Sequence, residues 1–209
     1  MIPARRSATV AAMSLRDASK MRYPLRTLLQ ATAIGAALCA PPARADLVNE
    51  NLLVVAPPGY EVGFRDRKKA SLITEWVPAG ETVNDWTEMV TVQVFYELKV
   101  APEAFMRDLE KRWRAACPGA GEAQTIASGK ENGYPALVRL LDCPRNPDSG
   151  KREITWFKAV EGNDGFYVVQ KAFKFMPTKE QIVRWVGYLR DVKVCDSRVA
   201  DHACPQTKD

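Results

Sequence analysis

The stretch Glu153–Phe175, EITWFKAVEGNDGFYVVQKAFKF, decides the fold. It contains two β-branched and aromatic segments, 153–160 and 166–175, on either side of the polar turn EGNDG at 161–165. Two such segments separated by a short polar, glycine-containing turn predict an antiparallel β-hairpin. Hairpins join antiparallel strands, whereas parallel strands need long crossover connections. The stretch therefore argues against a doubly wound parallel sheet.

Further strands are predicted on the N-terminal side of this hairpin. The clearest is MVTVQVFY at 89–96, which is rich in β-branched and aromatic residues and bounded on both sides. Other candidates are short apolar or alternating segments bounded by turn residues, at 52–55, 60–64, 71–77, 124–129 and 134–142. The polar run Arg65–Lys69 (RDRKK) is predicted to be a turn, and Asn132-Gly133 a hairpin turn.

Two segments change to a helical period. In 101–117, the residues Phe105, Leu109, Trp113 and Ala116 recur every three or four positions and form one apolar stripe. In 178–190, a second stripe passes through Trp185, and Thr178 with Gln181 has the spacing of a capping box. Both stripes are expected to be core.

These elements predict an α+β fold, with an antiparallel β-sheet of about six to seven strands and two main helices packed on it. The expected order is β-β-β-α-β-β-β-β-α. This order, the Pro-Pro-Gly-Tyr sequence at 57–60 and the late aromatic hairpin resemble the Mog1/PsbP-like fold, over about residues 50–195. Exported bacterial proteins of unknown function also have this fold. The resemblance implies a compact accessory or binding domain that is usually not an enzyme, and it transfers no site residue.

The first 45 residues have the layout of a secretory signal peptide. Met21 offers a second start, Arg22 and Arg26 supply positive charge, and 28–40 is a short, mostly apolar stretch before Pro41-Pro42. Small residues at Ala43 and Ala45 predict cleavage after Ala45, with cleavage after Ala40 as the alternative. The stretch is too short for a membrane anchor. We therefore predict a periplasmic or secreted protein, with residues 1–45 as the N-terminal extension and signal peptide and 46–209 as a single domain.

The same region offers two alternative export signals. Cys39 could be a lipoprotein cysteine, although Leu38 stands where a small residue is required. Arg5-Arg6 could open a twin-arginine signal, although Ser7-Ala8-Thr9 does not continue one.

The net charge of +5 misleads about the domain itself. Residues 1–45 hold seven of the 30 Lys and Arg and one of the 25 acids, so 46–209 carries 23 basic and 24 acidic groups. A charge of about −1 argues against nucleic-acid binding. After residue 45 no apolar run is long enough to span a bilayer.

Four cysteines remain after signal removal: Cys117, Cys143, Cys195 and Cys204. An even number in an exported domain predicts two disulfides, with three possible connectivities. We favour Cys117–Cys143, because the end of the first helix and the end of the 134–142 strand should meet at one end of the sheet. The second pair would then hold down the C-terminal tail. Neither zinc-type spacing nor a C-x-x-C motif is present.

The sequence offers little catalytic chemistry. The one histidine, His202, lies in the C-terminal tail, where no rigid scaffold would hold it beside a nucleophile. No nucleotide-binding glycine motif occurs. We therefore expect neither cofactor nor metal. Four acids gather around Trp76 and Trp86 and could act as general acids or bases or bind a cation: Glu75, Glu81, Asp85 and Glu88.

The aromatic residues suggest a binding surface. Alternate residues of the last hairpin face opposite sides of the sheet, so one apolar face is expected to stay open once the helices pack on the other. The candidate surface consists of Trp76, Trp86, Trp156, Tyr167 and Phe173. The basic run Arg65–Lys69 is a second candidate, for anionic lipid headgroups or an acidic partner.

We predict a monomeric, exported, non-enzymatic accessory or binding domain that engages a partner protein or a small apolar ligand in the bacterial envelope. The alternative is a secreted carboxylate-dependent hydrolase or lyase that uses acids around Glu75–Glu88. A third hypothesis is an envelope protein without any ligand.

Overall fold

The structure, a computed structural model, describes residues 47–205. The predicted signal peptide, Cys39 and Arg5-Arg6 lie outside these residues. The main sheet has seven strands in the order β2-β3-β4-β8-β7-β6-β5, and a second sheet pairs β1 with β9. The strands are β1 (Glu50–Leu53), β2 (Tyr60–Lys68), β3 (Ser71–Pro78), β4 (Glu88–Tyr96), β5 (Gln124–Glu131), β6 (Tyr134–Cys143), β7 (Glu153–Glu161), β8 (Gly165–Phe173) and β9 (Lys193–Asp196). The helices are α1 (Pro102–Ala116), α2 (Lys179–Asp191) and the 3-10 turn η1 (Ala200–His202).

Each strand pair of the main sheet is antiparallel, as the hairpin argument predicts. Two meanders, β2-β3-β4 and β5-β6-β7-β8, join side by side through the β4–β8 pair. The predicted α+β class is therefore confirmed, and the seven strands of the main sheet and the two helices follow the predicted order, while β1 and β9 add a separate pair. Most element ends lie within two residues of the predicted ones, and the largest difference is in β2. The run Arg65–Lys68 is strand rather than turn, and the first strand starts at Glu50.

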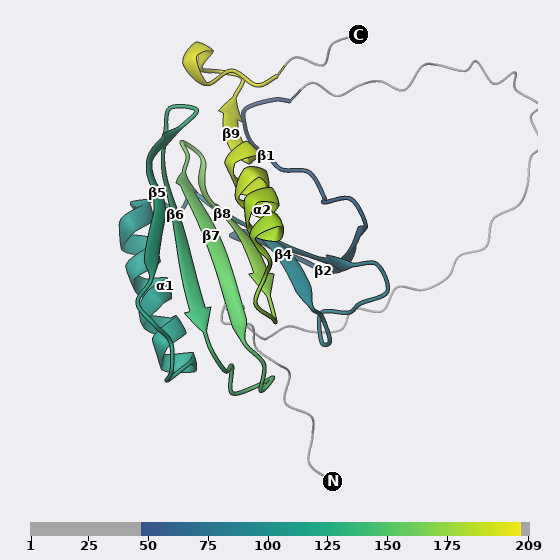
Figure 1. Cartoon of the computed structure of the whole chain (residues 1–209). Helices are drawn as coiled ribbons and strands as arrows, with labels where there is room; N and C mark the ends of the chain where they lie inside the picture. Colours follow the sequence, from purple (N-terminus) through teal and green to yellow (C-terminus); the bar gives the residue numbers. More distant parts are fainter. Residues whose placement is uncertain (1–46, 206–209) are drawn as a thin grey trace, which may run out of the picture.

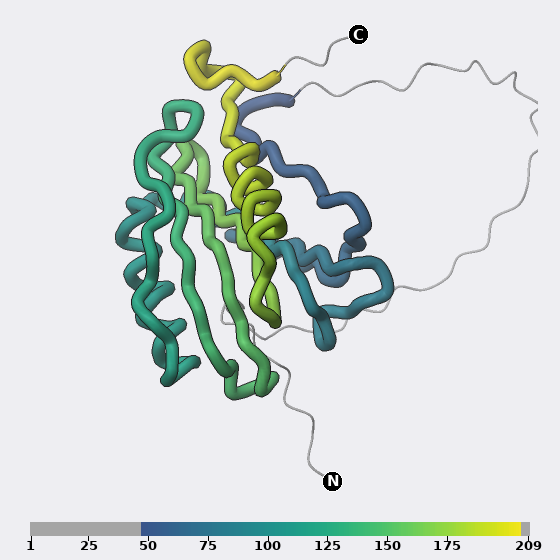
Figure 2. Tube along the Cα trace, viewed as in Figure 1, coloured from purple at the N-terminus to yellow at the C-terminus, as the bar shows by residue number. Residues whose placement is uncertain are grey.

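The strand β9 was not predicted. Its four residues follow α2 directly and pair with β1 from the other end of the described chain (Figure 2). A four-residue strand has no distinctive sequence pattern of its own, and its partner lies more than 140 residues away.

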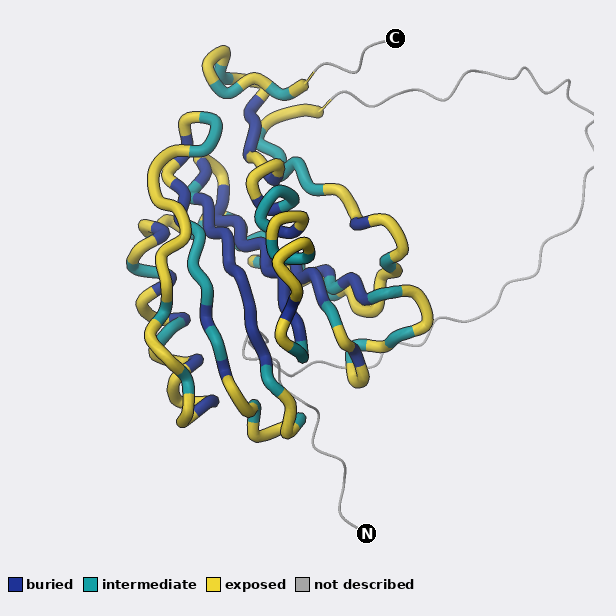
Figure 3. Tube along the Cα trace, in the orientation of Figure 1, coloured by how far each residue is buried: buried dark blue, intermediate teal, exposed yellow. Residues whose placement is uncertain are grey.

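The two helices cover opposite faces of the main sheet (Figure 1). From α1, Met106, Leu109 and Trp113 pack on one face, in a cluster with Phe157. From α2, Trp185 and Leu189 pack on the other face, in a cluster with Trp156. Because Trp156 and Phe157 are neighbours in β7, they necessarily point to opposite sides. The central strands β7 and β8 are thus buried on both faces, while the edge strands β2 and β5 are largely exposed (Figure 3).

Local signals set the helix ends. In α1, Pro102 occupies the first turn, where its missing N–H costs no helical hydrogen bond. In α2 the predicted capping box is present, since the Thr178 hydroxyl accepts from the Gln181 backbone N–H and the Gln181 side chain accepts from the Thr178 backbone N–H.

Two disulfides join segments at the ends of the fold. The structure pairs Cys117 with Cys143 and Cys195 with Cys204. The first joins the end of α1 to the end of β6, which is the pairing favoured from the topology. The second closes the segment that follows β9. No helix within residues 47–205 is long and apolar enough to cross a membrane.

Candidate functional site

The residues of the predicted aromatic surface are buried in the core. Trp76, Trp86, Trp156, Tyr167 and Phe173 are all buried, none of them more than 8% exposed. The prediction of an open apolar face is therefore wrong. It assumed that both helices pack on one face, whereas α1 and α2 take one face each, and the β1–β9 pair and the loop after β3 cover what remains.

The five predicted aromatic residues lie under three different parts of this cover. Trp76, Trp156 and Phe173 lie beneath α2. Tyr167 packs in the cluster that contains Val194 of β9. Trp86 folds onto the opposite face in a cluster with Met89. These side chains supply core packing and leave no apolar binding site on the last hairpin.

The four predicted acids do not converge. Glu81 accepts hydrogen bonds from the backbone N–H and hydroxyl of Thr87, both at 2.6 Å, and so holds its own loop together. Asp85 lies in the same loop, in a bridge with Thr82. Glu75 pairs in register with Thr91, three positions from Glu88 along β4, so Glu75 and Glu88 face opposite sides of the sheet. Burial raises the pKa of Glu75. Within the described chain no cluster of three or more His, Cys, Asp or Glu could hold a metal ion.

Glu88 instead belongs to a buried lysine cluster that the sequence analysis missed. The Lys171 ammonium donates to Glu88 Oε2 at 2.6 Å and contacts the Tyr60 hydroxyl oxygen at 2.7 Å. The same Nζ lies over three rings, 3.7 Å from the centroid of Trp185, 4.4 Å from Phe173 and 4.9 Å from Tyr60. The signal was present in the hairpin, where Lys171 occupies an inward position between Val169 and Phe173.

The electrostatics of this cluster follow from its burial. Complete burial lowers the pKa of Lys171 to about 7, although the Glu88 carboxylate acts in the opposite direction. Burial alone would raise the pKa of Glu88, but hydrogen bonds from Lys171 and Tyr60 outweigh it, and the pKa lies below its ordinary value. Lys171 has no exposed surface and cannot meet a ligand directly, so the cluster positions α2 on the sheet.

A second buried lysine holds the other end of α2. Lys158 donates to the backbone carbonyls of Leu189 and Val192 at 2.9 and 2.7 Å, and to Glu131 at 2.9 Å. It thereby satisfies carbonyls that a helix leaves free at its C-terminus, where positive charge is favoured. Burial lowers the pKa of Lys158. Lys158 and Lys171 therefore hold α2 against the centre of the sheet.

A charged cavity that is open to solvent lies at the hairpin-tip end of the sheet. It has a volume of about 580 Å³. The tip of the β2–β3 hairpin, the residues that end and follow β4, and the β7–β8 turn line it with Arg67, Lys69, Tyr96, Glu97, Lys99, Asn163 and Asp164. Two of the lining cations come from the predicted basic run, while Arg65 bonds to Thr74 and Lys68 pairs with Asp66.

Two contacts position the lining cations. The Arg67 guanidinium lies 5.8 Å from the centroid of the Tyr96 ring. The Lys99 ammonium donates to the backbone carbonyls of Gly162, at 3.0 Å, and Asn163. These contacts hold the hairpin tip and the β7–β8 turn around one space.

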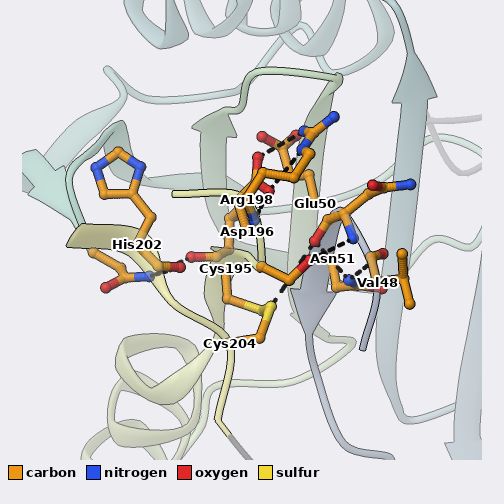
Figure 4. The surroundings of a disulfide bond; sticks show 12 residues. Val48, Glu50, Asn51, Cys195, Asp196, Arg198, His202 and Cys204 are labelled. Atoms are coloured by element: carbon orange, nitrogen blue, oxygen red, sulfur yellow. Dashed lines mark hydrogen bonds and ion pairs between the residues drawn. A yellow bond between two sulfur atoms is a disulfide. The ribbon is translucent and has the colours of Figure 1, made fainter. Parts of the chain in front are cut away.

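The C-terminal segment holds the β7–β8 turn that lines the cavity. Figure 4 shows Arg198, Asp196 and Glu50 close to the Cys195–Cys204 disulfide of this segment. Arg198 bridges Asp196 and Asp164, at 2.6 and 2.7 Å. Glu50 of β1 accepts from the backbone N–H of Asp164 at 2.9 Å and from the Tyr167 hydroxyl at 2.8 Å. The hydrogen bonds from Arg198 lower the pKa of Asp196 to about 2. The β7–β8 turn is thus anchored by residues from both ends of the described chain.

His202 lies in this tail, outside the main sheet, as expected. Its ring is 4.4 Å from that of Tyr134, and the Asn132 amide donates to its backbone carbonyl at 3.4 Å. It packs the tail against the β5–β6 hairpin.

Comparison with known proteins adds a resemblance in fold. No family model matches the chain, and no curated protein matches it. Among solved structures, it is similar to a point mutant of protein Mog1, with a TM-score of 0.39, 14% identity, and coverage of 68% of this chain and 87% of that one. It is also similar to the Saccharomyces cerevisiae Ran-binding protein Mog1p, with a TM-score of 0.38, 13% identity, and coverage of 69% and 87%. The search thus finds the fold that the element order resembles. TM-scores below 0.5 support no argument about the function of this chain.

Proposed function

We propose that this chain is an exported, non-enzymatic accessory domain that binds a partner in the bacterial envelope through the charged cavity at the hairpin tips. The observation that carries the proposal is the cavity itself. It gathers seven charged, polar or aromatic residues from three separate segments, in a domain whose five tryptophans are all buried. Concave sites with a few convergent polar groups are the usual form of a binding site.

Export is supported by the signal-peptide layout and by the two disulfides. Disulfides persist in oxidising compartments such as the periplasm and are rare in the cytosol. A non-enzymatic role is supported by the separation of the four acids and by the tail position of His202. The polar lining favours a polar partner over the small apolar ligand expected from the sequence, because the aromatic residues that suggested such a ligand form the core.

The test is native mass spectrometry of the protein recovered from its own host's envelope, combined with lysine cross-linking. We expect a chain that starts at Asp46 and lacks four hydrogens, with additional mass that dissociates on activation. We also expect cross-links to the partner from Lys69 and Lys99. Lys111 and Lys130, which lie on α1 and β5 away from the cavity, are the matched controls. A retained N-terminus or free thiols would contradict export. A bare chain without cross-links at the cavity would favour an envelope protein with no ligand.

The carboxylate-dependent hydrolase keeps one supporting observation, the raised pKa of Glu75. A catalytic pair of carboxylates must face each other across the scissile bond, and none of the other three predicted acids is placed to do so. If hydrolysis of any envelope polymer by the purified protein were abolished in Glu75→Gln, the hydrolase would replace the binding domain as the proposed function.

A further inference from the structure

The residues that line the cavity include more cations than carboxylates. Arg67 and Lys69 form no ion pair with any described residue, and Lys99 bonds only to backbone carbonyls. Of the two lining carboxylates, Asp164 is already paired with Arg198. Arg198 is shared with Asp196, so Asp164 keeps part of its charge, and the lining as a whole has three cations and two carboxylates.

We infer that this cavity binds an oxyanion, a phosphate or carboxylate group, carried by a small polar ligand. The inference rests on the proposed function and names the chemistry of its ligand. A charge-assisted hydrogen bond to an oxyanion is roughly twice as strong as a neutral one, and arginine presents a planar fork that matches phosphate and carboxylate in a bidentate manner. Arg67 is the lining residue with that geometry.

The cations are held before a ligand arrives. Arg67 rests against the Tyr96 ring, and Lys99 is fixed by two carbonyls of the β7–β8 turn. Groups that are already ordered lose less side-chain entropy when they bind, so more of their interaction energy appears as affinity. The turn that orients Lys99 is itself secured by Glu50 and Arg198.

The rest of the lining favours a small ligand over an anionic membrane surface. Glu97, Asp164 and the Asn163 amide share the cavity with the cations. Two carboxylates close to an anionic bilayer would repel it, whereas they and the amide can accept or donate hydrogen bonds to hydroxyl or amine groups of a small molecule. The volume of about 580 Å³ suits a small molecule. Since residues 46–209 are nearly neutral as a whole, the attraction comes from this local arrangement.

The test is an NMR titration of the isotope-labelled protein, recovered from its host's envelope, with inorganic phosphate and then acetate. We expect saturable shifts of the backbone amides of Glu97, Asn163 and Asp164. The dissociation constant should rise at least tenfold in the double variant Arg67→Gln/Lys69→Gln. Arg67→Lys keeps the charge and loses the planar fork, so its affinity should lie between that of the wild type and that of the double variant.

The matched controls are Arg107→Gln and Lys130→Gln, at exposed positions on α1 and β5, and their dissociation constants should stay within twofold of the wild type. Because Arg67 and Lys69 are exposed, all variants should retain the wild-type melting temperature, which verifies folding.

Three results would overturn the inference. The first is the absence of saturable shifts at the cavity. The second is an equal loss of affinity in the control variants, which would mean general surface charge. The third is binding to phosphatidylglycerol vesicles that depends on Arg67 without any saturable binding of phosphate, which would make the site a membrane contact.

If phosphate and acetate fail to bind while cross-links to an envelope partner still map to Lys69 and Lys99, the oxyanion inference is wrong and the proposed binding function stands. If phosphate and acetate fail to bind and the cross-links lie away from Lys69 and Lys99, the oxyanion and the binding function of the cavity are both wrong.

Discussion

Lys171 joins two elements through its contacts, although these contacts only partly offset the cost of burying its charge. An ammonium group is costly to remove from water unless it is paired and hydrogen-bonded. Here the carboxylate of Glu88 pairs with it, the Tyr60 hydroxyl lies within hydrogen-bond distance, and the negative faces of three rings surround it. Since Trp185 belongs to α2 and Lys171 to β8, the arrangement fixes the register of the helix on the sheet.

The stability of the fold should rise with pH because of this residue. In the unfolded chain Lys171 keeps its proton up to its ordinary pKa of 10.5, whereas in the folded protein it releases it from about pH 7. The unfolded state therefore binds more protons between these values, and the free energy of unfolding increases with pH across that window. We expect a gain of roughly 2 kcal/mol between pH 7 and pH 9, measured by urea unfolding. Lys171→Met should flatten this rise. An equally steep rise in the variant would show that other groups cause it.

Gly162 is required by a close approach at the cavity wall. A Cβ atom at this position would lie 2.2 Å from Glu50 Oε1 and 2.8 Å from the Tyr167 ring. Gly162→Ala should therefore destabilise the protein by about 1–3 kcal/mol, as overpacking does. The control is Gly187→Ala in α2, where a Cβ would meet nothing within 4 Å and should stabilise the helix by up to about 1 kcal/mol. Thermal unfolding of both variants checks the pair, and a neutral Gly162→Ala would contradict the proposed contact.

At the scale of elements, α2 depends on its N-terminal cap. The Thr178 hydroxyl accepts from the backbone N–H of Gln181, which would otherwise have no helical partner. Thr178→Ala should lower the free energy of unfolding by about 1 kcal/mol, and Thr178→Ser should recover most of the loss. Denaturant unfolding measures both, and equal losses in the two variants would show that the methyl group rather than the hydroxyl matters.

The tail closed by Cys195–Cys204 is the element that links the chain ends to the cavity. It places Arg198 against Asp164, and the adjacent strand β1 places Glu50 against the backbone of the same turn. Replacing both cysteines by serine should cost about 2–3 kcal/mol on the chain-entropy account of a nine-residue separation. The amide of Asp164 should also exchange its hydrogen faster, because the turn loses its anchor. Unchanged exchange at Asp164 would mean that β1 alone holds the turn.

At the scale of the whole molecule, the two disulfides act on different parts. Cys117–Cys143 ties α1 to β6, far from the hairpin tips, and its 26-residue separation is worth roughly 3–4 kcal/mol. The double variant Cys117→Ser/Cys143→Ser should therefore lose more stability than Cys195→Ser/Cys204→Ser, yet keep the affinity of the cavity. Melting temperatures and phosphate titrations of the two variants, below their transitions, test this separation. A larger loss of affinity in the Cys117 variant would contradict it.

Much of the architecture could be predicted from local sequence because its signals lie within a few residues. The turn EGNDG predicts its hairpin, the spacing of Thr178 and Gln181 predicts a helix start, and the stripe through Trp113 predicts a buried helix face. The pairing of Cys117 with Cys143 could also be predicted, because the directions of the hairpins place the end of α1 and the end of β6 at the same end of the sheet. In each case the physical cause is short-range geometry, either the period of a helix or strand or the requirements of a turn.

The candidate site depended on contacts that only tertiary structure makes. The two-residue period of a strand puts Trp156 and Phe157 on opposite faces of the sheet. It does not determine which helix covers each face. For this reason the sequence predicted an open aromatic surface where the structure has core. The cavity needs Arg67, Tyr96 and Asn163 to meet, and these come from segments about 30 and 70 residues apart. By itself the sequence determined the elements, their order and the antiparallel sheet. The packing of α1 and α2 on opposite faces, the burial of Lys171 and the charged cavity were decided by the tertiary structure, because burial and charge pairing depend on which distant side chains come together.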